Sequence, residues 1–405
     1  MLGPQLLLGR LAALETSLAD GTCTQFNGLV SEAAMLGSFG GLARYRLRLQ
    51  PWLWRLGQVR NSRVWQDKTV MEIVDIVFQE HAPHAEWRWS DETAAFMADA
   101  GTRSYCCQYR ESDLDFVTRL LTEEGLSWRI EETDEGHGVV LFGDSSQASA
   151  TPEDASSSAG GGIRFHGARA GEAHDSVQSL RARRSLRVGL STVLSYDYKA
   201  KKAVAASVPT AGAVGGPNAP LLESFDTPGQ YFYADGAQAC RYALLQMQAN
   251  EARRHLWQAR STVRTLRAGT RFTLTQGPLQ AGAGADADPA YVALRVVSVG
   301  VNNLPKPARE GLAELFGPIP ELLEQTLPEH DPELAAVIAQ ASTSGYANLV
   351  DAIAADTPWR PVVGENGLRH HPKPTAHGSQ SAIVVGPGGG ASASGADEIH
   401  CDRLG

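Results

Sequence analysis

Two adjacent carboxylates, Glu123 and Glu124, are the first residues of this sequence to consider for chemistry. Glycoside cleavage uses a pair of carboxyl groups that flank one bond. These two glutamates lie in a stretch with helical spacing, where consecutive side chains point about 100° apart. They do not suit hydrolysis, so we expect them to be solvated or to complement the charge of a neighbouring subunit.

Three histidines, His370, His371 and His377, share a short segment with Lys373. Two of them could form a metal clip, but zinc sites add Cys or further His or carboxylate ligands at close spacing. No Cys or carboxylate lies at that spacing, and Pro372 splays the chain. We expect an exposed polar linker here and predict no metal.

Enzyme motifs are not recognisable in the chain. It contains no Gly-x-Ser-x-Gly, His-Glu-x-x-His, Walker A or Rossmann pattern. The glycine-rich runs at 160–162 and 386–390 do not lead from a buried strand into a helix with a lysine, so flexible loops account for them. Asp286 and Asp288 form an acidic tip without the rest of a calcium loop. We predict no catalytic residue and no cofactor.

Arginines gather on two strand-like segments and are the candidate functional residues. In 42–49 they alternate with Tyr45, Leu47 and Leu49, which is the period of a half-buried strand. One interpretation is a wet barrel face whose arginine stems cover apolar surface. The other is an ion-pair surface between subunits, because arginine is favoured at interfaces. The candidate interface residues are Arg44, Arg46, Arg48, Arg183, Arg184 and Arg187.

Composition limits the class of protein. The chain has 405 residues, 43% of them hydrophobic, enough for two or three domains with a core. Its net charge of −9 argues against nonspecific nucleic-acid binding. The five cysteines show no Cys-x-x-Cys spacing, so we expect reduced thiols in a protein made in the cytoplasm. The first residues lack the basic start of a signal peptide, and no apolar run approaches the roughly 18 residues of a membrane span.

The best-defined element that must position these residues is a helix within 109–128. Ser112 is its predicted N-cap, with Asp115 where a capping-box acid belongs, and Gly125 ends it before a strand. Two further helices are predicted, at 67–81 with Asp67 as N-cap and at 235–256. The apolar stripe of the first helix is Leu114, Val117, Leu120 and Leu121.

The string 109–128 closely resembles the signature of the VgrG family (Vgr/Rhs), the tip or spike proteins of bacterial type VI secretion, which are similar to the hub of contractile phage tails. Further strings match the family in its order: Phe26–Ala33, Tyr45–Trp54, Arg63–Val70, Tyr196–Tyr198, Gly269–Leu274, Pro358–Pro361 and Gln380–Pro387. The set spans nearly the whole chain. Against the family pattern, the opening of the first barrel and the part beyond Gly405 are missing, so the chain resembles a hub truncated at both ends.

The resemblance implies an α+β fold: two antiparallel β-barrel halves of the phage tail hub type, a small α/β insert, a helical insertion and the start of an OB-fold. The expected organisation follows the chain. It comprises a partial first β-barrel (1–60), the α/β insert (61–144), a linker (145–162), the second β-barrel with the long helix (163–304), a helical insertion or connector (305–360), and a linker with the truncated OB-fold (361–405).

The resemblance also implies a structural, non-enzymatic role. Three copies would form a homotrimer that caps the Hcp tube next to baseplate proteins, and sheath contraction would drive it into a target cell. A PAAR-type tip protein and effectors would attach through the missing C-terminal part. The chain would leave the cell through the type VI apparatus without a signal peptide, with no nucleic-acid partner and no stable membrane insertion. The alternatives are a spike-borne enzyme, either a peptidoglycan hydrolase or a toxin, and a degenerate hub fragment.

Overall fold

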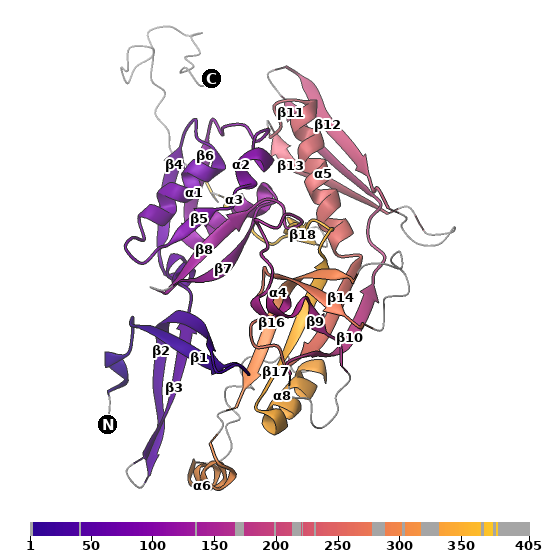
Figure 1. Cartoon of the computed structure of the whole chain (residues 1–405). Helices are drawn as coiled ribbons and strands as arrows, with labels where there is room; N and C mark the ends of the chain where they lie inside the picture. The colour runs from indigo at the N-terminus through magenta and orange to yellow at the C-terminus, as the bar shows by residue number, and fades with distance from the viewer. Residues whose placement is uncertain are drawn as a thin grey trace.

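The computed structural model describes residues 3–39, 42–133, 136–166, 174–197, 200–212, 220, 222–230, 232–277, 288–301, 304–316, 332–365, 368–375 and 378–379. These residues form an N-terminal sheet, an α/β insert above it, and a larger unit of two sheets with the longest helix (Figure 1). The α+β class predicted from the sequence is confirmed.

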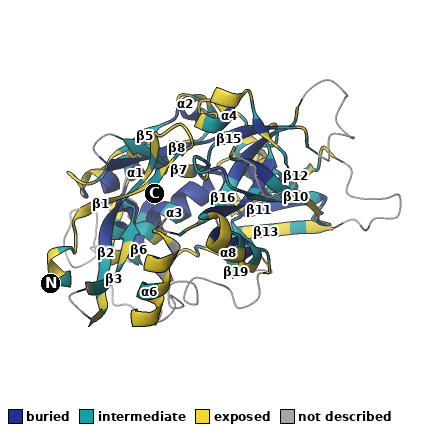
Figure 2. Ribbon diagram, turned by 60° about the horizontal axis from the view of Figure 1, so that its bottom comes forward, coloured by how far each residue is buried: buried dark blue, intermediate teal, exposed yellow. Residues whose placement is uncertain are grey.

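The N-terminal sheet is antiparallel and has the order β1–β2–β3. The predicted strand at 42–49 is present as β3, with the expected arginine face. Much of the apolar surface of this sheet is exposed, as the yellow stretches of β1 and its surroundings indicate (Figure 2). Its elements are the short helix η1 (Pro4–Leu6), β1 (Leu11–Ser17), β2 (Cys23–Phe39) and β3 (Leu42–Gln50).

The α/β insert is built around helices α1 and α3, whose apolar stripes meet in one core. Ser112 caps α3, since its hydroxyl accepts the N–H of Asp115 at 3.0 Å, as predicted. The predicted cap of α1 is wrong: Thr69, not Asp67, forms a capping box with Glu72. The elements are η2 (Trp52–Gln58), β4 (Arg60–Trp65), α1 (Val70–Gln79), β5 (Trp87–Trp89), α2 (Thr93–Phe96), β6 (Cys106–Ser112), α3 (Asp113–Glu123), β7 (Ser127–Thr133) and β8 (Gly136–Phe142).

The larger unit contains a six-stranded sheet with the order β10–β14–β17–β16–β15–β9. An isolated bridge between Phe165 and Val177 brings the two ends of this sheet together. Helix α8 covers β16 and β17 with an apolar face of its own. The elements are α4 (Ala155–Gly160), β9 (Ile163–Arg164), β10 (Val177–Arg184), β14 (His255–Ser261), β15 (Arg271–Thr275), β16 (Ala290–Gly300), α6 (Lys306–Phe316), α8 (Pro332–Ser344) and β17 (Tyr346–Ala354).

A second, three-stranded sheet with the order β12–β11–β13 packs against the long helix α5. Asp235 caps α5, because its carboxylate accepts the N–H of Gln238 at 2.9 Å. A two-stranded ladder, β18 with β19, lies between α5 and the insert (Figure 1). These elements are β11 (Leu190–Asp197), β12 (Lys202–Pro209), β13 (Glu223–Gln230), α5 (Gly236–Ala252), β18 (Gly364–Glu365) and β19 (Leu368–Arg369).

The structure corrects two predicted segments. Residues 305–360 are not wholly helical, because β17 is an inner strand of the six-stranded sheet with nearly every residue buried. The small-residue segment 145–162, predicted as a linker, is folded against β15: it contains α4, and Ala150, Thr151 and Ser157 are buried. The predicted start of an OB-fold falls mainly on residues 380–405, outside the described residues.

Candidate functional site

The first candidate surface lies on β3, where Arg44, Arg46 and Arg48 share one face. The neighbouring strand β2 supplies a carboxylate to two of them. Glu32 lies 2.7 Å from Arg46 and 3.7 Å from Arg48, and the three side chains keep 22–51% of their surface exposed. The arginine face is therefore partly neutralised from within the chain, and its role between subunits stays a prediction.

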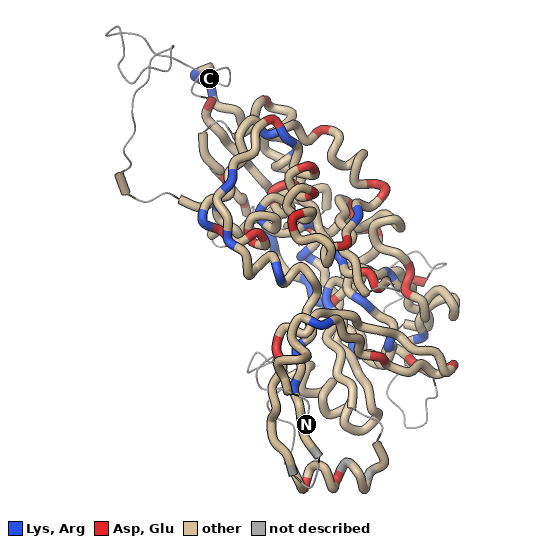
Figure 3. The backbone as a smooth tube through the Cα atoms, turned by 90° about the vertical axis from the view of Figure 1, so that its left-hand side faces the viewer, with Lys and Arg blue, Asp and Glu red and all other residues tan. Residues whose placement is uncertain are grey.

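The second candidate group, Arg183, Arg184 and Arg187, does not form a single face. Arg183 and Arg184 are consecutive and exposed at the end of β10, so their side chains point to opposite sides of the sheet. Arg187 follows the strand and lies 3.4 Å from Glu365. The two arginine groups belong to different sheets, and charges of both signs interleave along the backbone (Figure 3).

The glutamates Glu123 and Glu124 lie in the interior, which corrects the expectation that they are solvated or face another subunit. Only 8% and 2% of their surfaces are exposed. Arg103 joins them, with one terminal nitrogen 2.8 Å from each carboxylate. From α5, Arg241 lies 3.1 Å from Glu124, and the Tyr242 hydroxyl donates to it at 2.9 Å.

Two more residues extend this arrangement, which we call the ion network. Arg119 of α3 lies 2.5 Å from Glu111 and 4.0 Å from Glu123. The network contains three carboxylates and three guanidinium groups, so its formal charge is zero: Glu111, Glu123, Glu124, Arg103, Arg119 and Arg241. A buried ion network with balanced charge stabilises only as a complete set, because an unpaired buried charge costs several kcal/mol.

The pKa shifts in the network follow from this pairing. Burial acts to raise the pKa of Glu123, but Arg103 and the nearby cations Lys373 and Arg119 leave it below its usual value. Burial and the charge of Glu124 raise the pKa of Tyr242, so this hydroxyl keeps its proton and donates it in the hydrogen bond. Glu123 is thus held as a carboxylate, which suits ion pairing and not proton transfer.

A second buried charge, Asp113, was not predicted as a special residue. It is fully buried, and its carboxylate receives hydrogen bonds from Gln108 at 2.8 Å and Asn61 at 3.0 Å. Arg63 lies 2.7 Å away and His81 3.1 Å away. Burial acts to raise its pKa, but these hydrogen bonds and the charge of Arg63 outweigh that influence and leave the pKa below its usual value. Asp113 therefore ties α3 to β4, β6 and the end of α1.

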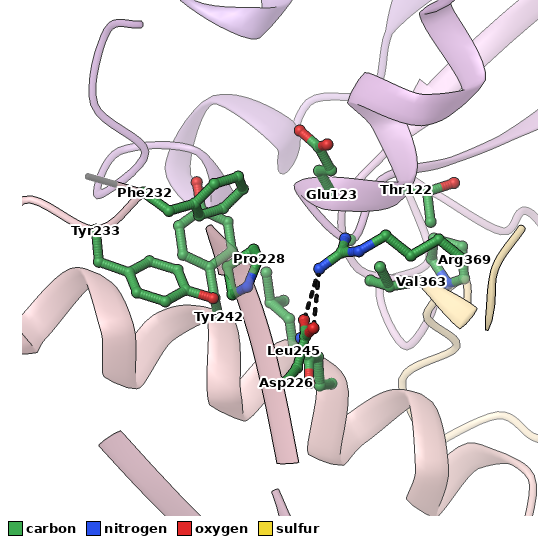
Figure 4. Close-up of a pocket in the computed structure, with 13 residues that line it drawn as sticks. Thr122, Glu123, Asp226, Pro228, Phe232, Tyr233, Tyr242, Leu245, Val363 and Arg369 are labelled. Carbon is green, nitrogen blue, oxygen red and sulfur yellow. Dashed lines mark hydrogen bonds and ion pairs between the residues drawn. The ribbon is translucent and has the colours of Figure 1, made fainter. Parts of the chain in front are cut away.

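A small pocket lies beside the ion network, between the end of α3, the helix α5 and the segment around β18 (Figure 4). Its volume of about 20 Å³ is close to that of one water molecule. Phe232, Tyr233 and Tyr242 line one side, and Asp226 and Arg369 form an ion pair on the other. Aromatic rings next to carboxylates form a site suited to a cation.

Little in the described ranges suggests catalysis. Those ranges hold no cluster of three His, Cys, Asp or Glu residues that could bind a metal ion. His370 and His371 lie after β19, and His377 lies outside the described residues. None of the helices described combines the length and apolar character needed to span a bilayer.

Comparison with known families agrees with this architecture. A profile of the family described as "Phage tail baseplate hub (GPD)" matches residues 2–304. Among curated proteins, the type VI secretion system spike protein VgrG4b of Pseudomonas aeruginosa is 30% identical over 404 residues, covering 94% of this chain. The spike protein VgrG1b of the same organism is 26% identical over 98% of this chain. The chain spans 40% and 45% of these two relatives.

A solved structure shares the fold. The E. coli c3393 protein, described as a component of the type VI secretion system with structural similarity to T4 bacteriophage tail proteins gp27 and gp5, superposes with a TM-score of 0.53. The match covers 89% of this chain and 69% of that one, at 16% sequence identity. The likeness therefore concerns the fold and not the details of any site.

Proposed function

Because the chain belongs to the phage tail baseplate hub family, we propose that it is the structural hub of a bacterial type VI secretion spike. The role is mechanical and needs rigidity rather than a catalytic site. The observation that supports it most directly is the ion network, which joins the α/β insert to α5 through buried charges. We infer that this joint keeps the insert and α5 in place relative to each other when a contracting sheath pushes the hub.

The proposed assembly is a homotrimer that caps the Hcp tube and contacts baseplate proteins. In it each chain contributes two barrel halves, so that three copies present six similar units. The joining of the six-stranded sheet at Phe165 and Val177 supports a barrel in the larger unit, and the N-terminal sheet is the proposed part of the other. The arginine face on β3, and Arg183, Arg184 and Arg187 at and after the end of β10, are the proposed contacts between subunits.

Delivery is proposed to use parts of the protein that relatives carry and this chain does not span. Effectors and a PAAR-type tip protein would attach there, while the protein, made in the cytoplasm, would leave through the type VI apparatus. The second candidate function is a spike-borne enzyme, and the third is a degenerate hub fragment. The buried, paired state of Glu123 and Glu124 argues against hydrolysis by this chain.

Release of the Hcp tube protein into the medium tests the hub function. In a strain without spare copies, deletion of the gene should abolish release, and re-expression should restore it. Undiminished release after deletion would contradict the hub function. A zymogram on purified peptidoglycan separates the alternative, because clearing by this chain would show an enzyme.

A further inference from the structure

The segment that follows β17 in the sequence contacts both the insert and the end of α5. We call its described residues, 359–365 and 368–373, the strap. At its start, the N–H of Trp359 donates to the Ser145 hydroxyl at 2.6 Å, and Arg360 donates to the carbonyl of Gly143. From the other side, Arg253, the residue directly after α5, donates to the carbonyl of Arg360 at 2.9 Å. Residues at the end of the insert and at the end of α5 therefore both bind the start of the strap.

The far part of the strap is fixed by charge. One terminal nitrogen of Arg369 lies 3.0 and 2.7 Å from the two carboxylate oxygens of Asp226 on β13 (Figure 4). The N–H of His370 closes the turn by donating to the carbonyl of Val363 at 3.1 Å. The strap thus contacts a third element, the three-stranded sheet.

The last contact of the strap is made by Lys373. Its ammonium nitrogen lies 4.1 Å from the centre of the Phe232 ring. That ring packs against Tyr233 and Tyr242, with centroids 5.2 and 6.3 Å away. Lys373 is exposed as a whole residue, but partial burial of its ammonium group lowers its pKa, while the charge of Glu123 opposes that shift. An ammonium group held over the face of an aromatic ring is a recognised mode of cation binding.

We propose that the Phe232 ring, supported by its packing against Tyr233 and Tyr242, is an ammonium-binding site for Lys373, and that this contact anchors the end of the strap. The ligand class is a primary alkylammonium supplied by the chain itself. Only the biological role of this contact rests on the proposed hub function. In a contraction-driven hub, the contact would transmit a force from the end of the strap to the rest of the chain. The contact itself is a property of the single chain.

The test is amide hydrogen exchange on the full chain, followed at the strap amides that include His370. Lys373→Met keeps the apolar stem and removes the charge, whereas Lys373→Arg keeps a cation over the ring. We expect the Met variant to raise exchange of the strap amides about three- to thirtyfold, as for loss of a cation–π contact, and the Arg variant to restore most of the protection. Lys202→Met, at an exposed lysine of β12, is the matched control and should change nothing in the strap.

Two results would overturn the anchor. One is unchanged protection in Lys373→Met, and the other is equal loss in the Met and Arg variants, which would show that the charge has no part. Asp226→Asn provides a second measurement, because it loosens the strap at Arg369 and should add to the effect of Lys373→Met. Hcp release is measured separately. If the anchor is intact but the protein is not needed for release, the result contradicts the hub function and leaves the anchor standing.

Discussion

Arg241 of α5 lies 3.1 Å from the carboxylate of Glu124 at the end of α3, although 117 residues separate them along the chain. Glu124 is 2% exposed, so the pair is shielded from water and from salt. The Tyr242 hydroxyl and Arg103 share the same carboxylate. One residue at the end of a helix therefore receives the main polar contacts between the insert and α5.

Removing this carboxylate should destabilise the whole chain. In Glu124→Ala the guanidinium of Arg241 stays buried without its partner, and we expect a loss of about 3–5 kcal/mol of unfolding free energy. Urea unfolding followed by tryptophan fluorescence measures it. As a control, Arg46→Met removes the half-exposed pair with Glu32 and should cost at most about 1 kcal/mol. Similar losses in the two variants would contradict a special role for the buried pair.

Acid should weaken the fold through Asp113. Its folded-state pKa lies below the usual value, so its contribution to stability is complete above the unfolded pKa near 4 and is lost as the pH falls through the folded pKa. We expect the wild-type unfolding free energy to fall between about pH 5 and pH 2. Asp113→Asn should be less stable at pH 7 and show a shallower fall. An equally steep fall in the variant would place the effect elsewhere.

The turn after α3 should be destabilised by a side chain at Gly125. Gly125 has a φ of +72°, and a Cβ there would lie 2.9 Å from Leu245 and 3.3 Å from Arg360. We expect Gly125→Ala to cost more than the roughly 1–2 kcal/mol of backbone strain, because the buried Leu245 side chain of α5 and the Arg360 side chain must also shift. Gly161→Ala is the matched control, since Gly161 has a φ of +65° with nothing within 4 Å of the added carbon. Equal thermal unfolding shifts would show that the contact with α5 has no influence.

Charge reversal on β3 should separate assembly from folding. In Arg46→Glu with Arg48→Glu, two like charges face Glu32 across the sheet, but these side chains are partly exposed, so we expect a stability loss of only about 1 kcal/mol. If the face contacts another subunit, co-purification of differently tagged copies should fall at least tenfold. Arg88→Glu, which breaks the exposed pair with Glu131 in the insert, is the control. Loss in both variants would point to general instability instead.

Local signals predicted the elements well. Ser112 and Asp115, followed by an apolar stripe and Gly125, specify α3 because capping, helical period and a positive φ are properties of neighbouring residues. The error in segment 305–360 has a physical cause. β17 is buried on both sides of its sheet, so it lacks the alternation of a half-exposed strand and reads like the helix before it.

The burial of the charged residues was not predicted from the sequence, for a different reason. Glu123 and Glu124 look like surface residues because their partners, Arg103 and Arg241, come from distant segments. Adjacent acids within a helix are expected to point in different directions and to lie in different environments. Here α3 ends at Glu123, and both side chains are buried. The one available signal was their position directly before Gly125, where the chain turns inward. The pair between Arg241 and Glu124 spans 117 residues and depends on the completed fold.

Because β17 lies between β14 and β16 in the sheet but follows both in the sequence, the sheet can be completed only late in synthesis. The residues of β14 and β16 are synthesised before residues 346–354, so until β17 leaves the ribosome both strands lack the neighbour that lies between them. Until then the facing edges of β14 and β16 are open and able to pair with other chains. Slow folding through distant pairing is the expected kinetic result. A nascent hub would thus be most vulnerable to aggregation in the interval between the emergence of β16 and that of β17, which is when a chaperone would have most to protect.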